Sequence, residues 1–473
     1  EISAQQLFGG LRTQGKLPVS INKEFTEGFG LQTSSLSRLR YGIPEEVHLS
    51  SLKLAKIDSV ANEVIKQKMA PGLQVLVARY GRVVYQKSFG FHTADAKQKV
   101  KNSDMYDVAS LTKILATLPL LMKAEGEGKI HIESSLKRLV PELKGSNKDT
   151  ITIKEVLSHN ARLKAWIPFY KGAQDSITGK NLTSYYSSKK SKKHGIKVAE
   201  NMYLKTTFKD SIFKYIKNAD QREQSGYKYS DLGYYLFKKV LEKKYKKPLE
   251  NLAQQYFYQP LGANRTSYLP LQKFSKKEIV PTEKDDYFRG QLLHGYVHDM
   301  GAAMQGGVGG HAGLFSNTND IAKLMQLYLQ KGFYGGKRYL KGTTLETFNR
   351  RYYKTQKIRE TLSALMDDEA SELELHRAMR EVGEDDSLNE TWSRYHLAAS
   401  AMRKELPLDF VDSSAELRAA INMALVSEPV PQRAPQWPQT LGRVAIAASV
   451  AVLAIFGAQQ YQTFEPTAAI PLI

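Results

Sequence analysis

The chain has 473 residues, of which 42% are hydrophobic and 25% are charged, and its formal net charge is +20. This composition is typical of a folded protein with two or more domains and excludes a largely disordered chain. There is no cysteine, which excludes disulfides and thiolate metal sites. No other motif predicts a metal site, so we expect a protein without a metal and without another cofactor.

The charge is distributed unevenly along the chain. Residues 1–359 hold 60 Lys and Arg against 31 Asp and Glu, whereas residues 360–428 hold 6 against 16. A shift of this size indicates a boundary between segments of different character. We place the main junction of the chain near residue 359.

The first part of the chain predicts a helix and a hairpin. Residues 1–45 contain short apolar pieces that Gly and Pro interrupt. A one-sided apolar stripe predicts a helix over 52–68. The apolar segments 72–79 and 82–89 are separated by Tyr80-Gly81, which predicts two strands joined in a hairpin.

Ser110 and Lys113 form the first candidate catalytic pair. They lie in the stretch D-V-A-S-L-T-K, directly before the apolar run 114–122. The run predicts a helix, and the spacing places hydroxyl and amine on one helical face, where the amine can take the hydroxyl's proton. The S-x-x-K pattern is weak evidence on its own, because further copies occur, for example at Ser225.

Tyr229 and Asp231 form the second candidate pair. They belong to a Tyr-Ser-Asp triplet at the start of an amphipathic helix that ends before Pro248. A Pro-Glu-Leu segment at 141–143 and the segment I-T-I-K-E-V-L-S-H, which ends at His159, precede this triplet. Ser and Asp are also good helix N-caps, so ordinary capping is an alternative interpretation of the triplet.

A glycine-rich segment, G-G-V-G-G-H-A-G-L-F-S, occupies residues 306–316, and a predicted helix over 319–330 follows it. The glycines indicate tight turns or close approach of the backbone to a cleft. The segment is not a phosphate loop, because no Gly-Lys-Ser/Thr follows. His311 and Gly313 lie in its His-Ala-Gly triplet.

The order of these segments resembles the serine β-lactamase/penicillin-binding protein superfamily, close to its class C, esterase and D-aminopeptidase branch. The resemblance covers residues 72–163 and includes the Tyr-Ser-Asp and glycine-rich segments downstream. It implies an α+β fold with a central antiparallel sheet and helices. It also implies acyl transfer through a serine on an ester, a β-lactam or a D-amino-acid peptide, including peptidoglycan-derived substrates.

The resemblance assigns roles to individual residues. Ser110 is the implied nucleophile, Lys113 and Tyr229 handle its proton and that of the leaving group, and Asp231 orients the lysine and the substrate. The candidate substrate-binding residues are His311 and Gly313. His159 is expected to be a structural hydrogen-bonding residue.

The third motif of the superfamily, a Lys/His-Thr/Ser-Gly triplet, is missing after Gly313. The nearest segment is Lys354-Thr-Gln356, which lacks the glycine. We therefore expect a hydrolase domain that is truncated at about residue 352, with an incomplete central sheet and with little or no turnover.

Residues 170–224 are rich in Lys, Tyr and Ser and include the run S-S-K-K-S-K-K at 187–193. We expect a solvated surface insertion. A surface attracted to an anionic cell-wall polymer is an alternative. The tyrosines are too scattered to predict a nucleic-acid interface.

The acidic segment predicts three short helices over 361–428, the third opened by a capping box at Ser413 and Glu416. Its blocks L-S-A-L-M-D-D-E-A-S-E-L-E-L and T-W-S-R-Y-H-L-A-A-S-A-M-R resemble the cytoplasmic domain of RseA/MucA-type anti-sigma factors. The resemblance implies binding of an extracytoplasmic-function sigma factor. The candidate sigma-factor-binding residues are Leu365, Met366, Trp392 and Tyr395. A generic acidic helical bundle is the alternative.

A membrane-spanning helix is predicted over 441–464. Residues 444–458 are all apolar or small, and adding the residues up to 464 makes the segment long enough to cross a bilayer. Arg443 predicts that its N-terminal side is cytoplasmic. A buried helix of a folded domain is the alternative.

These segments predict an order of domains. Residues 1–48, with the pieces A-Q-Q-L-F-G-G and G-K-L-P-V-S-I, resemble the tail of a family-three glycosidase domain, and no glycosidase activity is expected of them. The further predicted domains are a C-terminally truncated β-lactamase-like hydrolase domain (49–353), an anti-sigma helical domain (360–428), a Pro-rich linker (429–440), a transmembrane helix (441–464) and a periplasmic stub (465–473).

Two functions remain open at this point. One is an impaired serine hydrolase of exported type joined to a sigma-factor-binding domain. The other is an anti-sigma factor, anchored by a single pass in the inner membrane, whose hydrolase part is inactive. The two resemblances imply opposite sides of a membrane for the two halves, so the simplest interpretation is a fusion of two truncated sequences near 353–360. The expected partners are a small-molecule or peptidoglycan-derived substrate, a sigma factor and the inner membrane, without direct binding of nucleic acid.

Overall fold

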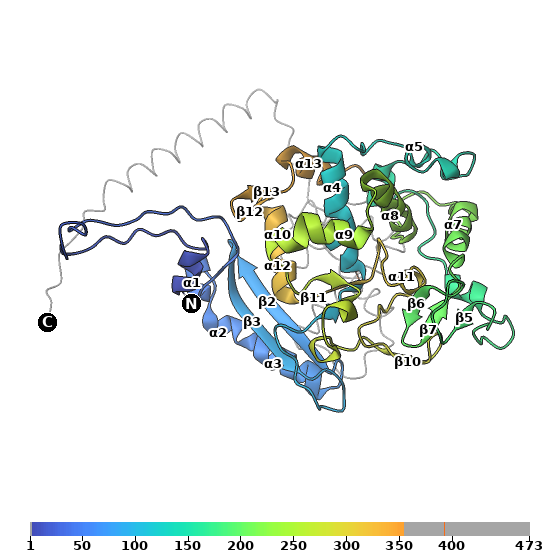
Figure 1. Cartoon of the computed structure of the whole chain (residues 1–473), viewed down its shortest axis with the longest axis horizontal. Helices are drawn as coiled ribbons and strands as arrows, with labels where there is room; N and C mark the ends of the chain where they lie inside the picture. The colour runs from blue at the N-terminus through green and yellow to red at the C-terminus, as the bar shows by residue number, and fades with distance from the viewer. Residues whose placement is uncertain (1, 354–391, 393–473) are drawn as a thin grey trace, which may run out of the picture. The chain divides into compact units, whose positions relative to one another are not determined.

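The computed structural model of the protein describes residues 2–353 and Trp392. Residues 1–361 form one compact unit, and residues 362–473 form a second. Every helix and strand with defined bounds belongs to the first unit (Figure 1). Apart from Trp392, the predicted anti-sigma domain, linker and membrane helix lie outside the described residues.

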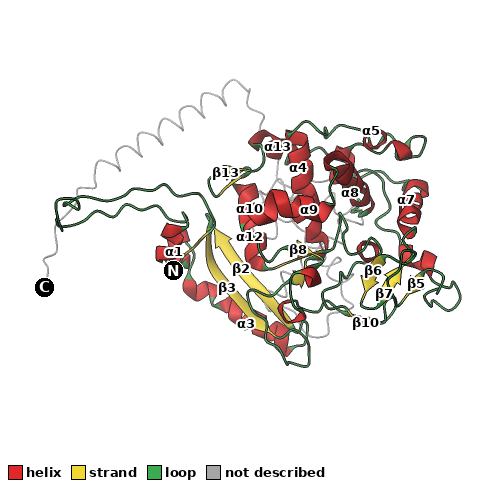
Figure 2. Ribbon diagram, in the orientation of Figure 1, coloured by secondary structure: helices red, strands yellow, loops and turns green. Residues whose placement is uncertain are grey.

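The first unit mixes short helices and short strands, as an α+β fold requires (Figure 2). The α-helices are α1 (Ile2–Leu7), α2 (Ser51–Leu54), α3 (Lys56–Lys66), α4 (Leu118–Gly126), α5 (Leu136–Leu139), α6 (Ile153–Leu157), α7 (Phe208–Asn218), α8 (Leu232–Tyr245), α9 (Leu249–Ala253), α10 (Gln259–Leu261), α11 (Met300–Ala303), α12 (Thr318–Leu329) and α13 (Gly342–Phe348). The strands are β1 (Arg40–Tyr41), β2 (Gly72–Arg79), β3 (Arg82–Gly90), β4 (Tyr106–Asp107), β5 (Tyr186–Ser187), β6 (Ile196–Ala199), β7 (Met202–Leu204), β8 (Ser267–Tyr268), β9 (Lys284–Asp285), β10 (Gln291–Leu292), β11 (Leu314–Ser316), β12 (Phe333–Tyr334) and β13 (Lys337–Arg338).

The predicted hairpin is confirmed by β2 and β3, which pair antiparallel with a register shift between Val77 and Ala78. Tyr80 and Gly81 both have positive φ, 50° and 73°, which is the backbone that a two-residue hairpin turn requires. The predicted helix over 52–68 is divided into α2 and α3, and α3 packs on β3. β1 pairs in parallel with β3, so the end of the first predicted segment packs with the segment that follows residue 49.

A second three-stranded sheet, in the order β4-β11-β8, joins segments that are far apart in sequence. Phe315 in β11 lies opposite Asp107 in β4 on one side and opposite Ser267 in β8 on the other. This sheet matters for function because β4 leads directly into Ser110. It fixes the turn that carries Ser110 against the glycine-rich segment.

The main core lies around α4, α8 and α9. The predicted helix after Ser110 is present, but it is built from a 3-10 turn (Ala109–Leu111), a π-helical turn (Lys113–Thr117) and α4. Leu120 and Leu121 of α4 and Phe237 of α8 are fully buried in the same cluster. Burial of such side chains stabilises a fold by about 1.5–3 kcal/mol each.

The basic segment 170–224 has more structure than the predicted solvated insertion. β5, β7 and β6 form a small antiparallel sheet, and α7 follows it directly. Phe208, Ile212 and Ile216 of α7 are buried in the main core. The lysine run itself is exposed, as predicted.

Within residues 2–353 no helix is long and apolar enough to cross a membrane. The predicted membrane-spanning segment 441–464 lies outside these residues.

Replacing Gly310 by Ala is expected to destabilise the fold by about 1–3 kcal/mol. A Cβ at this position would lie 2.2 Å from the backbone oxygen of Tyr234 in α8. The Gly310 carbonyl also accepts a hydrogen bond from Thr117 Oγ1 (2.6 Å), which limits how far the segment can shift. Urea unfolding measures the change. Gly15→Ala is the control, because a Cβ there meets no atom within 4 Å. Equal stability of the two variants would contradict the close packing of the glycine-rich segment.

Candidate active site

Ser110 lies at the turn between β4 and the helix that contains α4, and it is exposed. The residue before it, Ala109, has a φ of 44°, a left-handed conformation that is unfavourable for a residue with a Cβ. Asp107 holds this turn in place: one carboxylate oxygen accepts from Ala109 N (2.9 Å) and the other from His298 N (2.6 Å). The exposed hydroxyl is therefore presented on a turn that other segments constrain.

Lys113 is 3% exposed and lies at the centre of the site. Its Nζ donates to Ser110 Oγ (2.8 Å) and to the backbone oxygen of His311 (3.3 Å), and it forms an ion pair with Asp231 Oδ1 (2.7 Å). The rings of Tyr229 and Tyr234 lie beside the same nitrogen, with their centroids at 4.8 Å and 5.4 Å. Three oxygens and two aromatic faces thus surround one amine.

The Tyr229–Asp231 triplet is held by two neighbouring segments. Ser230 N donates to His159 Nδ1 (3.1 Å), and Ser230 Oγ donates to Lys164 O (2.6 Å). Asp231 N donates to the backbone oxygen of Ala165 (2.9 Å). Ser230 also accepts from the first N–H of α8, so the triplet combines the helix cap with the site.

Tyr229 is 40% exposed, and its ring lies 4.6 Å from the ring of His159. Among the described residues no hydrogen bond joins its hydroxyl to Ser110 or Lys113. The structure therefore places the ring, and not the phenol oxygen, against the amine. The role of the hydroxyl in proton transfer stays a prediction.

His311 is 1% exposed, and its ring stacks on Tyr235 with a centroid distance of 4.3 Å. Its Nε2 donates to Asp299 Oδ1 (2.7 Å), and Asp299 also accepts from Ala302 N at the start of α11. Only its backbone oxygen reaches Lys113. Substrate binding by His311 stays a prediction, and its observed contact with the site is through the main chain.

Gly313 has a φ of 113°, and a Cβ there would lie 2.4 Å from the backbone oxygen of Gly307. Glycine is therefore required at this position for the local chain path. A direct contact of Gly313 with substrate stays a prediction.

Burial and charge shift the pKa of several groups around the site. Burial raises the pKa of Asp107, although the two backbone N–H donors oppose the shift. Burial likewise acts to raise the pKa of Asp299, but the charge and hydrogen bond of His311 outweigh it and lower the pKa to about 2. Burial and the nearby Lys113 charge lower the pKa of His159 to about 4. Asp299 is thus ionised and His159 neutral at pH 7.

The structure brings together Ser110, Lys113 and Asp231, and it places Tyr229 beside them. It adds Asp107 and Asp299, which sequence reasoning did not single out. Asp107 was visible in the quoted D-V-A-S-L-T-K stretch, but nothing local shows that it reaches His298. Within residues 2–353 no group of three or more His, Asp or Glu side chains is placed to hold a metal ion. Leu365, Met366 and Tyr395 lie outside the described residues, and the structure does not test them or Trp392 as sigma-factor ligands.

Two family models match the chain. Residues 61–369 match the model described as Beta-lactamase. Residues 356–443 match the model described as Anti sigma-E protein RseA, N-terminal domain.

Curated relatives match the hydrolase part. The chain is 30% identical over 317 residues to an N-acetylmuramyl-L-alanine amidase of Bacillus subtilis (strain 168), covering 61% of this chain and 66% of that protein. It is 30% identical over 336 residues to a "Putative D-alanyl-D-alanine carboxypeptidase" of Salmonella agona (strain SL483), covering 65% and 71%. The chain thus spans about two thirds of the length of these relatives.

Solved structures show more distant similarity. The octameric penicillin-binding protein homologue from Pyrococcus abyssi is 19% identical, with a TM-score of 0.48, over 64% of this chain and 61% of that one. A class C β-lactamase from Rhodobacter sphaeroides is 16% identical, with a TM-score of 0.43, over 63% and 70%.

Acid is expected to destabilise the protein through His159. Its folded-state pKa lies below the unfolded value of 6.5, so the unfolded chain binds the proton first as the pH falls. The contribution of neutral His159 to the free energy of unfolding is fully present above pH 6.5 and decreases by roughly 3 kcal/mol as the pH falls towards 4. Urea unfolding at several pH values measures this slope, which His159→Gln should reduce.

His131→Gln is the matched control, because the His131 side chain is 67% exposed. It should keep the wild-type slope between pH 6.5 and 4. An unchanged slope in His159→Gln would contradict the neutral, buried state of His159.

Proposed function

The chain belongs to the β-lactamase family, and from this premise we propose that Ser110 is the nucleophile of a penicillin-binding-protein-type acyl-transfer site. The observation that carries the proposal is the distance of 2.8 Å between Lys113 Nζ and Ser110 Oγ. A weak nucleophile needs an adjacent base, and these two atoms are within direct proton-transfer reach. The S-x-x-K pattern occurs six more times in the sequence. Within residues 2–353, only in the Ser110 copy does the lysine contact Asp231 and Tyr229.

The arrangement around Lys113 suits the first chemical step. Ser110 Oγ bonds to the carbonyl carbon of the substrate while the carbonyl π bond opens to an oxyanion. The Ser110 proton passes to Lys113 Nζ after the ammonium that pairs with Asp231 has released a proton to solvent. The ammonium that forms meets the carboxylate of Asp231 and the backbone oxygen of His311. The positive charge is therefore stabilised at the place where the step creates it.

The later steps need a proton for the leaving group and a donor for the oxyanion. We assign the first to Lys113 with Tyr229, because the Tyr229 side chain is 40% exposed and its ring lies 4.8 Å from the amine. The backbone N–H groups at the start of the Ser110 helix would stabilise the oxyanion. Water then releases the acyl group from Ser110.

The proposed substrates are D-amino-acid peptides derived from peptidoglycan, with esters and β-lactams as further acyl donors. The names of the relatives, an amidase of N-acetylmuramyl-L-alanine and a D-alanyl-D-alanine carboxypeptidase, support this class. Such substrates would place the hydrolase part in the cell envelope.

Slow turnover is part of the proposal. No Lys/His-Thr/Ser-Gly triplet follows Gly313 in the sequence. The wall of the cleft that such a triplet supplies in the superfamily is therefore unaccounted for, whereas Ser110, Lys113 and Asp231 are in contact on the other side. We expect acylation to survive better than complete turnover.

A second candidate function belongs to the C-terminal segment, whose match to the anti-sigma model favours it. We propose that this segment binds an extracytoplasmic-function sigma factor through Leu365, Met366, Trp392 and Tyr395. Its excess of acidic residues suits a basic partner surface. An anchor in the inner membrane through 441–464, and a fusion of two sequences near 353–360, complete this alternative. One DNA read across the junction tests the fusion.

Labelling of the whole chain with a fluorescent penicillin or a fluorophosphonate should give an adduct that Ser110→Ala abolishes. Lys113→Met should slow labelling by about 10²–10⁴-fold, because the proton acceptor is lost. Asp231→Asn should slow it less, because only the partner of Lys113 changes. Ser225→Ala is the control, since this exposed serine begins another S-x-x-K copy. A folded protein without a Ser110-dependent adduct would refute the proposed function.

Co-expression of the whole chain with an extracytoplasmic-function sigma factor should give a complex that co-purifies at low salt. Trp392→Ala and Leu365→Ala should each weaken it, because buried aromatic and aliphatic anchors dominate such interfaces. Ser110→Ala should leave it unchanged. Failure to recover any complex at low salt would count against the second function.

A further inference from the structure

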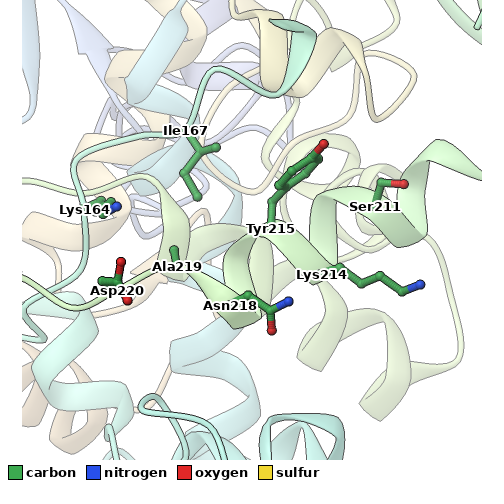
Figure 3. A pocket seen from close by; sticks show the side chains of 8 residues that line it. All are labelled: Lys164, Ile167, Ser211, Lys214, Tyr215, Asn218, Ala219 and Asp220. Atoms are coloured by element: carbon green, nitrogen blue, oxygen red, sulfur yellow. The ribbon is translucent and has the colours of Figure 1, made fainter. Parts of the chain in front are cut away.

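We propose that a cavity beside α7 binds a carboxylate of an acidic peptide substrate, a deepening that rests on the proposed function. The cavity has a volume of about 500 Å³. It lies between α7 and the segment that contains Lys164 and Ile167 (Figure 3). Ser211, Lys214 and Asn218 line it from the helix.

The charged side chains that line the cavity favour a ligand with a single negative charge. Lys164 and Lys214 are exposed, and neither forms an ion pair with another residue in the range 2–353. Asp220 lies in the same lining, as Figure 3 shows, so the lining side chains carry one net positive charge. The buried Lys148 lies outside the lining and interacts electrostatically with Asp220 and Lys164. This charge suits a carboxylate, whereas Asp220 would repel the second charge of a phosphate dianion.

The remaining lining suits a short acidic side chain. The hydroxyl of Ser211 and the amide of Asn218 can donate hydrogen bonds to a carboxylate. Ile167 and Ala219 supply apolar surface for the methylene groups that precede it. Glutamate has this combination of groups.

Lys148, which is 1% exposed, contacts the chain at the rim of the cavity. Its Nζ donates to Asn147 Oδ1 (2.6 Å), to Lys217 O (3.2 Å) and to Ala219 O. The backbone oxygens of Lys217 and Ala219 lie at the end of α7, where a helix leaves such oxygens without intrahelical partners. Lys148 therefore holds the Asn218–Asp220 end of the helix in one position.

The cavity is linked directly to the proposed active site. Lys164 O accepts from Ser230 Oγ, and the next backbone oxygen, that of Ala165, accepts from Asp231 N. Ile167 lines this cavity and also a smaller one that Asp231 and Asp299 line. A ligand that extends from Ser110 past Asp231 would thus meet Lys164 on this segment and Lys214 on α7.

Binding of two peptides to the whole chain carrying Ser110→Ala tests the inference. The peptides are acetyl-Glu-Lys(acetyl)-D-Ala-D-Ala and the same peptide with Gln in place of Glu. The Kd of the Glu peptide should be about fivefold lower, the size expected for one partly exposed ion pair. Lys164→Met and Lys214→Met should each reduce this preference, and raised salt should weaken it.

Lys189→Met is the matched control, because it removes an exposed charge of the same basic segment outside the cavity. The preference should survive in it. Equal Kd values for the two peptides, no measurable binding of the Glu peptide, or loss of preference in Lys189→Met would each overturn the inference. Stronger displacement of the Glu peptide by inorganic phosphate than by acetate would also overturn it.

Failure of this inference can be told apart from failure of the proposed function. The binding assay uses a protein that lacks the nucleophile, so it does not depend on turnover. A Ser110-dependent adduct without peptide discrimination refutes the cavity alone. Discrimination without any adduct refutes the acyl-transfer proposal and leaves the cavity as a binding site.

Discussion

The cluster of acceptors around Lys113 Nζ is the interaction on which the site depends. Lys113 is nearly fully buried, and an isolated charge in such a place would be strongly unfavourable. Asp231, the His311 backbone oxygen and Ser110 Oγ compensate for it together. Removing one partner of a buried pair typically costs about 3–5 kcal/mol. The amine that can activate Ser110 is thus also the group that joins three separate segments.

These segments are themselves fixed by polar contacts that are remote from the hydroxyl. Asp107 joins the Ser110 turn to His298, and the adjacent residue, Asp299, holds His311. Two neighbouring residues therefore set the positions of Ser110 and of the backbone oxygen that faces Lys113. Such redundancy keeps the left-handed Ala109 in place, because several contacts would have to break before the turn could relax.

Local sequence patterns predicted many of the helices and strands of this fold, but they did not predict its tertiary contacts. The 72–90 hairpin and the limits of α8 follow from alternation, turn residues and apolar periodicity, which are properties of neighbouring residues. Ser110, Lys113, Tyr229 and Asp231 were found because their order matched a known family. The bond between Asp299 and His311 could not be found in this way, because it depends on how the loop before α11 folds back. The regular structure within 170–224 was also not predicted, because the many lysines of this segment obscure the apolar periodicity of α7 in the sequence.

The segments that position Ser110 lie before the stretch in which no Lys/His-Thr/Ser-Gly triplet occurs. In the described part of the chain β2 pairs only with β3, so the other edge of this sheet has no partner there. Ser110, however, is held by the β4-β11-β8 sheet and by α8, all of which lie between residues 106 and 316. The geometry of Ser110 and Lys113 therefore does not require strands beyond 316. A defect on the opposite wall would act on substrate positioning, which is a separate requirement from activation of the hydroxyl. The two can fail independently in this chain, since no contact described around Lys113 involves β2.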